Sequence, residues 1–205
     1  MSSYDYPLKL SFKLIALAPR IIVTDAKGRE VLFVSQKVFK LKEDVRIYTD
    51  KRKAQEVFHI NAEKNLYFNT RYNFYESGSE KHLGSVKAKG WRSIWRATYH
   101  LGDADGSDTH YIKEDNPWMK IGDALFSEIP VVGMFTGYVF HPSYTCYEGT
   151  NYEDESHPIM QIKKEAAFFE GVYTIELIDH EIDREEEIRA LLRFMLIVQF
   201  MRRRG

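Results

Sequence analysis

Four basic residues that lie close together in the chain are of the types that bind phosphate groups. They are interleaved with two tryptophans, in the order Lys87, Lys89, Trp91, Arg92, Trp95 and Arg96. In a regular strand the two arginines share a face, and so do the two lysines, because side chains alternate. A bulge at Gly90 would align the two pairs. An arginine guanidinium holds phosphate oxygens through paired hydrogen bonds. The four basic residues are therefore the candidate site for an anionic headgroup, and the alternative is a solvated outer surface with the tryptophans packed against a helix.

Two further groups of arginines could meet a charged partner. Arg202, Arg203 and Arg204 follow the last apolar segment, and near an anionic membrane each would contribute about 1 kcal/mol. They equally serve solubility and the negative end of a helix dipole. Arg193 stands in the apolar segment itself. We expect it either to extend to the edge of that segment or to meet a buried carboxylate.

The residue types that most often carry catalysis or bind metals lack the spacing for it. The seven histidines show no H-x-x-x-H or H-E-x-x-H pattern, and there is no G-x-S-x-G, Walker or G-x-G-x-x-G motif. Asp103, Asp105 and Asp108 surround Gly106, but this glycine is fourth from Asp103, whereas a calcium loop needs it sixth. Cys146 is expected to be a small buried hydrophobe. We therefore predict a non-enzymatic protein without a metal or a cofactor.

Length and composition favour one soluble domain. The chain has 205 residues, which suits a single all-β barrel, and its 29 basic residues nearly balance 30 acidic ones. This balance gives no argument for a nucleic-acid partner. The only cysteine suits a reducing compartment, and the N-terminal residues lack the apolar segment of a signal peptide. No apolar run reaches the ~18 to 20 residues that span a bilayer. We expect a cytoplasmic protein, either free or peripheral at the inner membrane surface.

The last segment, residues 183–204, is the one around which we expect the other elements to fold. Asp183 and Glu186 have the spacing of a helix start, in which the aspartate caps a free N–H group and the glutamate reaches back. Acidic residues stand near the start and arginines at the end, as the helix dipole favours. Ten of the twelve residues from Ala190 to Met201 are apolar, with no amphipathic stripe. A helix that is apolar on all sides is surrounded by protein, so this segment is predicted to form a core.

Alternation of apolar and polar residues predicts antiparallel strands along most of the chain. It begins with Leu8, Leu10, Phe12 and Leu14. A hairpin pattern, 21–24 with 31–34, returns about 25 residues later, and such a repeat favours a meander closed on itself. About eleven to thirteen strands are expected, the others lying at 38–42, 45–49, 56–61, 65–74, 83–89, 92–101, 143–148, 157–164 and 167–178.

Residues 103–140 are interpreted as an insertion in the middle of this single domain. Residues 102–116 are polar and predict a loop. Asn116 and Pro117 have the types of a helix start, and the apolar residues that follow recur at spacings of three and four. The insertion is therefore predicted to contain one short amphipathic helix, which ends before Pro130.

The apolar stretch at 129–140 has two interpretations. It contains Gly133 and Gly137 in a G-x-x-x-G pattern, but it is too short and too interrupted for a membrane dimer motif. We expect it to be a buried connector. The alternative is an exposed apolar loop that touches lipid.

Several stretches, in this order along the chain, resemble the LURP-one-related and tubby C-terminal-like group of proteins. They are I-I-V-T-D-A-K-G-R-E-V-L-F-V with D-V-R-I-Y-T-D near the start, L-G-S-V-K-A-K-G-W-R-S-I-W-R-A-T-Y at 83–99, H-P-S-Y-T-C-Y at 141–147, and K-K-E-A-A-F-F-E-G-V-Y-T-I-E-L before the last apolar segment. Phospholipid scramblases are similar in fold. The resemblance covers nearly the whole chain. It implies a closed antiparallel barrel of twelve strands threaded by the C-terminal helix, and it transfers no headgroup-binding residue.

The expected fold is therefore mainly β (α+β), a single domain over 1–205 in which a closed barrel of about twelve strands surrounds the helix at 183–204. Because the helix would fill the lumen, any ligand is expected outside the barrel. Tubby domains bind phosphoinositide headgroups and scramblases act at membranes, so the resemblance implies a module that recognises anionic lipid or phosphoinositide headgroups. The alternative is a protein-interaction or scaffold module that uses 102–140. Neither hypothesis fixes an oligomeric state.

Overall fold

Twelve antiparallel strands and one long helix make up the described part of the computed structural model, namely residues 2–13, 20–36, 44–64, 69–89, 98–102, 107–115, 142–167 and 170–202. The strands are β1 (Leu8–Lys13), β2 (Arg20–Thr24), β3 (Glu30–Gln36), β4 (Asp44–Tyr48), β5 (Glu56–Lys64), β6 (Asn69–Glu76), β7 (Lys81–Lys89), β8 (Thr98–Gly102), β9 (Asp108–Glu114), β10 (Ser143–Glu148), β11 (Pro158–Glu165) and β12 (Glu170–Leu177). The helix is α4 (Arg184–Arg202). The predicted antiparallel β fold with a C-terminal helix is confirmed.

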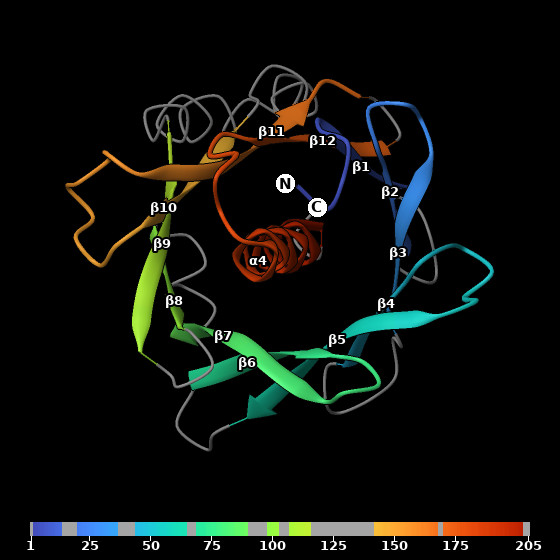
Figure 1. Cartoon of the computed structure of the whole chain (residues 1–205), viewed down its shortest axis with the longest axis horizontal. Helices are drawn as coiled ribbons and strands as arrows, with labels where there is room; N and C mark the ends of the chain where they lie inside the picture. Colours follow the sequence, from blue (N-terminus) through green and yellow to red (C-terminus); the bar gives the residue numbers. More distant parts are fainter. Residues whose placement is uncertain are drawn as a thin grey trace, which may run out of the picture.

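Strand pairing follows the order of the chain and then joins its two ends. Each strand pairs with the one before and the one after it, and β1 also pairs with β12, so the sheet closes into a barrel (Figure 1). Leu8 lies opposite Ile175 and Leu10 opposite Tyr173 in the closing pair. A closed sheet leaves no unpaired strand edge on its wall.

Side-chain alternation determines which face of the wall is apolar. In β1, Leu8, Leu10 and Phe12 are buried while Lys9 and Lys13 are exposed. Successive side chains in a strand point to opposite faces, so the buried set lines the lumen and the lysines face solvent. Other strands repeat this pattern, and their buried residues form one core cluster with the helix.

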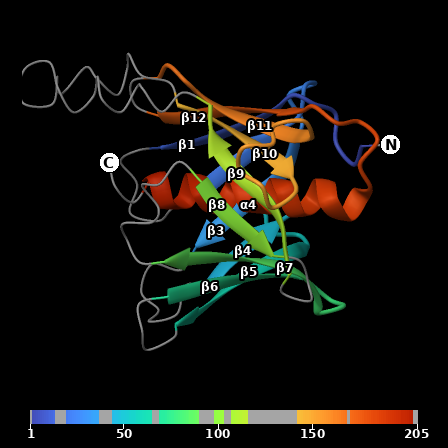
Figure 2. The ribbon, with the colours of Figure 1, turned by 90° about the vertical axis from the view of Figure 1, so that its left-hand side faces the viewer.

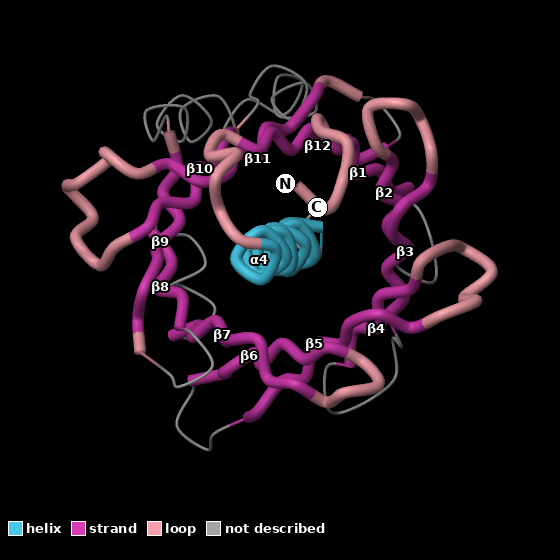
Figure 3. Tube along the Cα trace, in the orientation of Figure 1, coloured by secondary structure: helices cyan, strands magenta, loops and turns pink. Residues whose placement is uncertain are grey.

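Helix α4 occupies the lumen of the barrel, as the views along and across its axis show (Figures 2 and 3). Every residue from Ala190 to Gln199 is at most 3% exposed, so the helix is covered on all sides. This explains why its sequence carries no amphipathic stripe, since no face of it meets water. Its 19 residues correspond to about 28 Å of helix, long enough to thread the barrel.

The start of α4 is capped as its sequence predicts, but only by half of the expected arrangement. The Asp183 Oδ1 atom accepts a hydrogen bond of 2.8 Å from the Glu186 backbone N–H. The Glu186 carboxylate does not complete a capping box, because it points into the lumen and binds Arg193 there. An ion pair in the dry interior takes the place of a cap on the helix surface.

The N-terminal residues lie across the barrel mouth at which α4 begins (Figure 1). The Ser3 backbone N–H donates a 2.7 Å hydrogen bond to the Glu187 carboxylate, which is 1% exposed. Tyr4 and Tyr6 pack against the core beside it. Burial, with the nearby Glu187 charge, raises the pKa of Tyr4 to about 12 and that of Tyr6 well above its ordinary value, so both phenols stay protonated.

The two ends of the barrel differ in which strand connections and chain segments lie there. At the end where α4 begins, which we name the helix-start end, β2 turns into β3, β4 into β5, β6 into β7 and β10 into β11. At the opposite, helix-exit end, β1, β3, β5, β7, β9 and β11 finish, and so does α4 (Figure 2). Each end therefore gathers segments that are far apart in the sequence.

The prediction of a loop over 102–116 was wrong, because β9 lies within it. Ile112 faces the lumen and Tyr111 the outside, and both are fully buried. Tyr111 is covered from outside by β10 and by the β10–β11 connection: its ring stacks on Tyr147 of β10 at 5.1 Å, and its hydroxyl donates to the Asp154 carbonyl of the connection. Since both faces of β9 are covered, the strand shows no alternation of apolar and polar residues.

Several predicted elements lie outside the described residues. They are the strand at 38–42, residues 92–97 of the strand at 92–101, the insertion helix before Pro130, and the apolar stretch at 129–140. Of the three C-terminal arginines, Arg202 is the last residue of α4, and the other two also lie outside. In the described ranges, no helix has the length and apolarity needed to cross a bilayer.

Candidate functional site

The structure places only part of the predicted headgroup site. Lys87 and Lys89 are in the last part of β7, where their backbones pair with Arg71 and Asn69 of β6. The described side chains do not include these two lysines, and Arg92 and Arg96 lie outside the described residues. The two lysines therefore belong to the helix-exit end of the barrel, and the geometry of the four-residue cluster stays a prediction.

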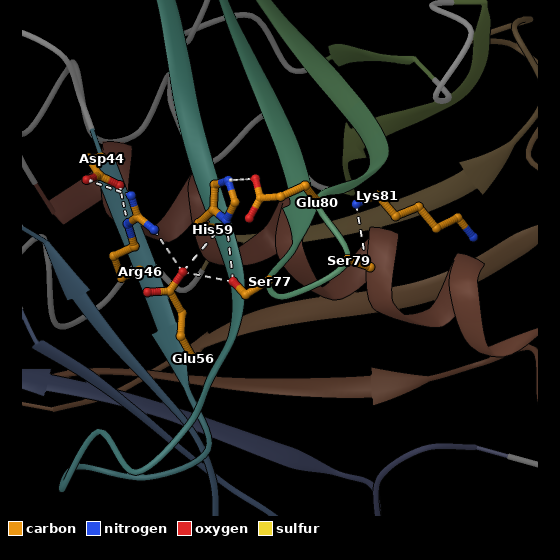
Figure 4. A network of polar contacts seen from close by, with 8 residues as sticks. All are labelled: Asp44, Arg46, Glu56, His59, Ser77, Ser79, Glu80 and Lys81. Carbon is orange, nitrogen blue, oxygen red and sulfur yellow. Dashed lines mark hydrogen bonds and ion pairs between the residues drawn. The ribbon is translucent and has the colours of Figure 1, made fainter.

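A second polar cluster lies on the outer face of the barrel, over β4, β5 and the β6–β7 turn (Figure 4). We name it the outer network; its residues are Asp44, Arg46, Glu56, His59, Ser77 and Glu80. Arg46 donates to Asp44 at 2.6 and 3.2 Å and to Glu56 at 2.8 Å. These carboxylates, the hydrogen-bonded Asp44 first, raise the pKa of the Arg46 guanidinium above its ordinary value. With both carboxylates already bound, Arg46 is not poised to hold an external anion.

His59 links the two halves of the outer network. Its side chain is 5% exposed although it lies on the outer face. Its Nδ1 atom is 3.3 Å from the Ser77 hydroxyl and its Nε2 atom is 3.5 Å from the Glu80 carboxylate. The ring stacks on Tyr75 at 5.1 Å, and Tyr75 in turn packs on His82 at 5.2 Å. Three rings in a row on neighbouring strands thus shield the imidazole from water.

Ser77, His59 and Glu80 have the residue types of a catalytic triad but not its hydrogen bonds. The Ser77 hydroxyl donates to Glu56 at 2.8 Å, so its proton is directed away from His59. The imidazole Nδ1 atom then donates to the serine oxygen, whereas a general base must accept the serine proton. The outer network therefore ties β4, β5 and the β6–β7 turn together, and it does not activate a nucleophile.

A third polar cluster lies inside the barrel and contains a fully buried charge. We name it the interior network; its residues are Glu186, Arg189, Arg193 and His110. Arg193 is 0% exposed and donates to Glu186 at 2.9 Å, which confirms that it meets a carboxylate. Arg189 and the His110 ring lie 3.0 and 3.3 Å from the same carboxylate. A buried charge needs such a partner, because taking it from water alone costs several kcal/mol.

Cys146 faces the lumen next to this interior network. It is fully buried, and burial raises the pKa of its thiol to about 12, although the nearby Arg193 charge opposes the rise. The prediction of a small buried hydrophobe agrees with this position. Because the pKa is higher in the folded protein than in the unfolded chain, the thiol costs no stability at neutral pH. It lowers stability only as the pH rises above about 8.5.

Cys146 is therefore expected to be unreactive in the native protein. At pH 8 its thiolate population should be roughly a thousandfold lower than in the unfolded chain. We expect a chromogenic disulfide reagent to label the native protein far more slowly than the protein in denaturant. The single cysteine makes the readout specific. Rapid native labelling would show that the lumen opens readily at this position.

Sequence reasoning missed the outer network for a definite reason. Its residues come from two strands and a distant turn, and only the strand register brings them together, with Arg46 opposite His59. The available signal was the alternation in β4, where Val45 and Ile47 point inward and Arg46 must point outward. A charged residue on an outer face is common, so this signal does not by itself indicate a network.

Within the ranges that the structure describes, no three side chains of histidine, cysteine, aspartate or glutamate are placed to hold a metal ion. The chain matches no protein-family model, no curated protein and no solved structure. Any function must therefore be argued from the barrel and its surfaces.

Proposed function

We propose that this protein is a non-enzymatic, tubby-like module that binds anionic lipid headgroups at a membrane surface. Lys87, Lys89, Arg92 and Arg96 form its basic site, and the inner face of the cell membrane is the surface it meets. The resemblance to tubby and scramblase domains supports this proposal. The lysines and arginines offer hydrogen-bond donors to phosphate oxygens, with arginine able to bind them in pairs.

The filled lumen favours an outside site. Barrels that carry small molecules keep an internal cavity, whereas α4 occupies this one with residues at most 3% exposed from Ala190 to Gln199. A lipid headgroup does not need such a cavity, since it can meet a basic surface at the membrane plane.

The observation that carries the proposal is the difference between the segments that join the strands at the two ends. At the helix-exit end, β7 finishes with Lys89, and the chain continues as G-W-R-S-I-W-R-A before β8; β3 is followed by K-V-F-K-L-K-E before β4. At the helix-start end the β2–β3, β4–β5, β6–β7 and β10–β11 connections read D-A-K-G-R, T-D-K-R-K-A-Q, S-G-S-E and G-T-N-Y-E-D-E-S-H; the second is basic, but none of them combines lysine or arginine with an aromatic residue. Aromatic and basic residues together are typical of segments at a membrane interface, and the polar turns are not.

Liposome flotation of the whole chain tests the proposal. We expect binding to vesicles that contain anionic lipid, loss of that binding at higher salt, and none to neutral vesicles. Lys87→Glu/Lys89→Glu should weaken binding at least tenfold, given about 1 kcal/mol per basic residue near the surface. The matched control is Lys51→Glu/Arg52→Glu, which makes the same change in charge at two exposed residues of the helix-start end.

Three outcomes would count against the proposal. Equal weakening by both double variants would show a response to net charge alone. Salt-independent binding to neutral vesicles would point to apolar insertion instead of headgroup recognition. No binding by a folded sample would favour the protein-interaction alternative, in which the insertion at 102–140 is the binding segment; the part of it in β9 belongs to the barrel wall, so 116–140 would carry the contact.

A further inference from the structure

A cavity of about 240 Å³ lies at the helix-start end of the barrel, between the first turn of α4 and strands β5, β6 and β7. Its floor is apolar and consists of Phe58, Leu83 and Ile188, each at most 7% exposed. Its rim is charged and consists of Glu76, Lys81, Arg184 and Glu185. The Lys81 and Glu185 side chains are 53% and 35% exposed, so the rim is open to solvent. This is the form of a small-molecule site, apolar inside with a few polar groups at the entrance.

The two positive and two negative charges on the rim cancel, but not all of them are paired with another group in the described part of the chain. Lys81 forms an ion pair with Glu185, and the Ser79 hydroxyl donates to Glu76 at 2.7 Å. The exposed Arg184 guanidinium makes no hydrogen bond or ion pair with another residue that the structure describes. Two cations and two carboxylates around one entrance match a ligand that itself carries both charges.

We propose that this cavity binds a free apolar α-amino acid such as leucine. The ligand side chain packs on Phe58, Leu83 and Ile188. Its carboxylate accepts hydrogen bonds from Arg184, and its ammonium group donates to Glu76 and Glu185, whose carboxylates accept several hydrogen bonds each. A 150 Å³ apolar cavity is known to hold benzene, so about 240 Å³ accommodates a branched four-carbon side chain with its charged groups at the entrance.

This inference is independent of the proposed lipid function. The cavity is at the helix-start end, whereas the basic site belongs to the helix-exit end. Failure of lipid binding would leave the amino-acid site untouched, and the reverse also holds.

Three small probes separate the contributions to binding. They are L-leucine, 4-methylpentanoate, which lacks the ammonium group, and 3-methylbutylamine, which lacks the carboxylate. Binding to the full chain is followed by two-dimensional NMR, with the backbone signals of Leu83 and Ile188 as reporters. We expect L-leucine to bind about fivefold or more tightly than either analogue, because each analogue leaves one charged group of the rim without its partner.

Single exposed substitutions then assign each contact. Arg184→Gln should weaken L-leucine and 4-methylpentanoate about three- to fivefold and leave the amine unchanged. Glu76→Gln should weaken L-leucine and the amine and leave the carboxylate probe unchanged. Arg52→Gln, an equally exposed arginine in the β4–β5 turn, is the control and should change nothing.

Two results would overturn the assignment. The first is the absence of signal changes with L-leucine up to about 20 mM, well above a millimolar Kd. The second is equal affinity for all three probes, which would mean that the cavity selects only apolar groups. Neither result depends on a variant that risks unfolding.

Discussion

Arg193→Met, with Glu186 left in place, should lower the free energy of unfolding by about 3 to 5 kcal/mol. Arg193 is 0% exposed and lies 2.9 Å from the Glu186 carboxylate. Methionine fills a similar volume, so the loss comes from the charge and not from a cavity. The substitution leaves the Glu186 carboxylate in the dry lumen with one cation fewer around it. Since a domain of this kind is stable by about 5 to 15 kcal/mol, the loss is a large share of the total. Urea unfolding followed by circular dichroism measures it.

A second replacement separates the ion pair from packing. Glu186→Gln in the Arg193→Met background removes the buried charge that has lost one of its two arginine partners, so the double variant should be more stable than the single one by about 1 to 2 kcal/mol. Arg20→Met, at an exposed position on β2, is the matched control and should change stability by less than about 0.5 kcal/mol. A loss below about 1 kcal/mol for Arg193→Met would mean that Arg189, 3.0 Å from the same carboxylate, is sufficient to stabilise the Glu186 charge.

Gly171→Val should cost about 3 kcal/mol, close to the upper limit for an overpacked core. Gly171 lies opposite Phe12 in the pair that closes the barrel. A Cβ atom at this glycine would lie 2.6 Å from the Cε1 and Cε2 atoms of the Phe12 ring and closer still to Cζ. The ring covers the glycine and stacks on Tyr173 at 6.2 Å, so any side chain at 171 must displace it. Thermal and urea unfolding should both show the loss.

The same clash predicts a specific rescue. Phe12→Ala alone should cost about 3 to 5 kcal/mol, because a 5% exposed ring is removed from the core. The double variant Phe12→Ala/Gly171→Val should lose at least about 1 kcal/mol less free energy of unfolding than the two single variants lose in sum, because valine partly fills the space of the ring. Thr174→Val, facing outward on the same strand, controls for the strand preference of valine. Strictly additive losses would show that the ring moves aside without cost.

The sequence predicts the central helix well because its signal is local. The cap at Asp183 and the apolar run after Ala190 are read without knowing any other element, and the structure has a helix from Arg184 to Arg202. The expected strands also depend on local alternation, and most have counterparts in the barrel. Arg193 is a further success, since a charge in a dry helix must find a partner.

The missed features depend on contacts between distant segments. The sequence predicts a loop at β9 because polar residues such as His110 and Glu114 occupy its lumen-facing positions. His110 is accommodated there because it lies close to Glu186 on α4. The charged rim at Arg184 and the outer network at His59 likewise form only when the register and the helix position are known. Sequence patterns report the environment of a strand, but they do not report which distant side chain shares that environment.

The pairing of β1 with β12 has a consequence for how the chain is made on the ribosome. The first strand cannot pair with β12 until β12 has been synthesised, so the wall stays open until the ribosome has passed Leu177. Helix α4 is complete only at Arg202, 25 residues after β12 ends at Leu177, and synthesis of these residues takes roughly 1 to 5 seconds at about 5–20 residues per second. During that interval the inward faces of all twelve strands have nothing to cover them. Until α4 enters the lumen, the nascent chain therefore exposes apolar surface that favours aggregation.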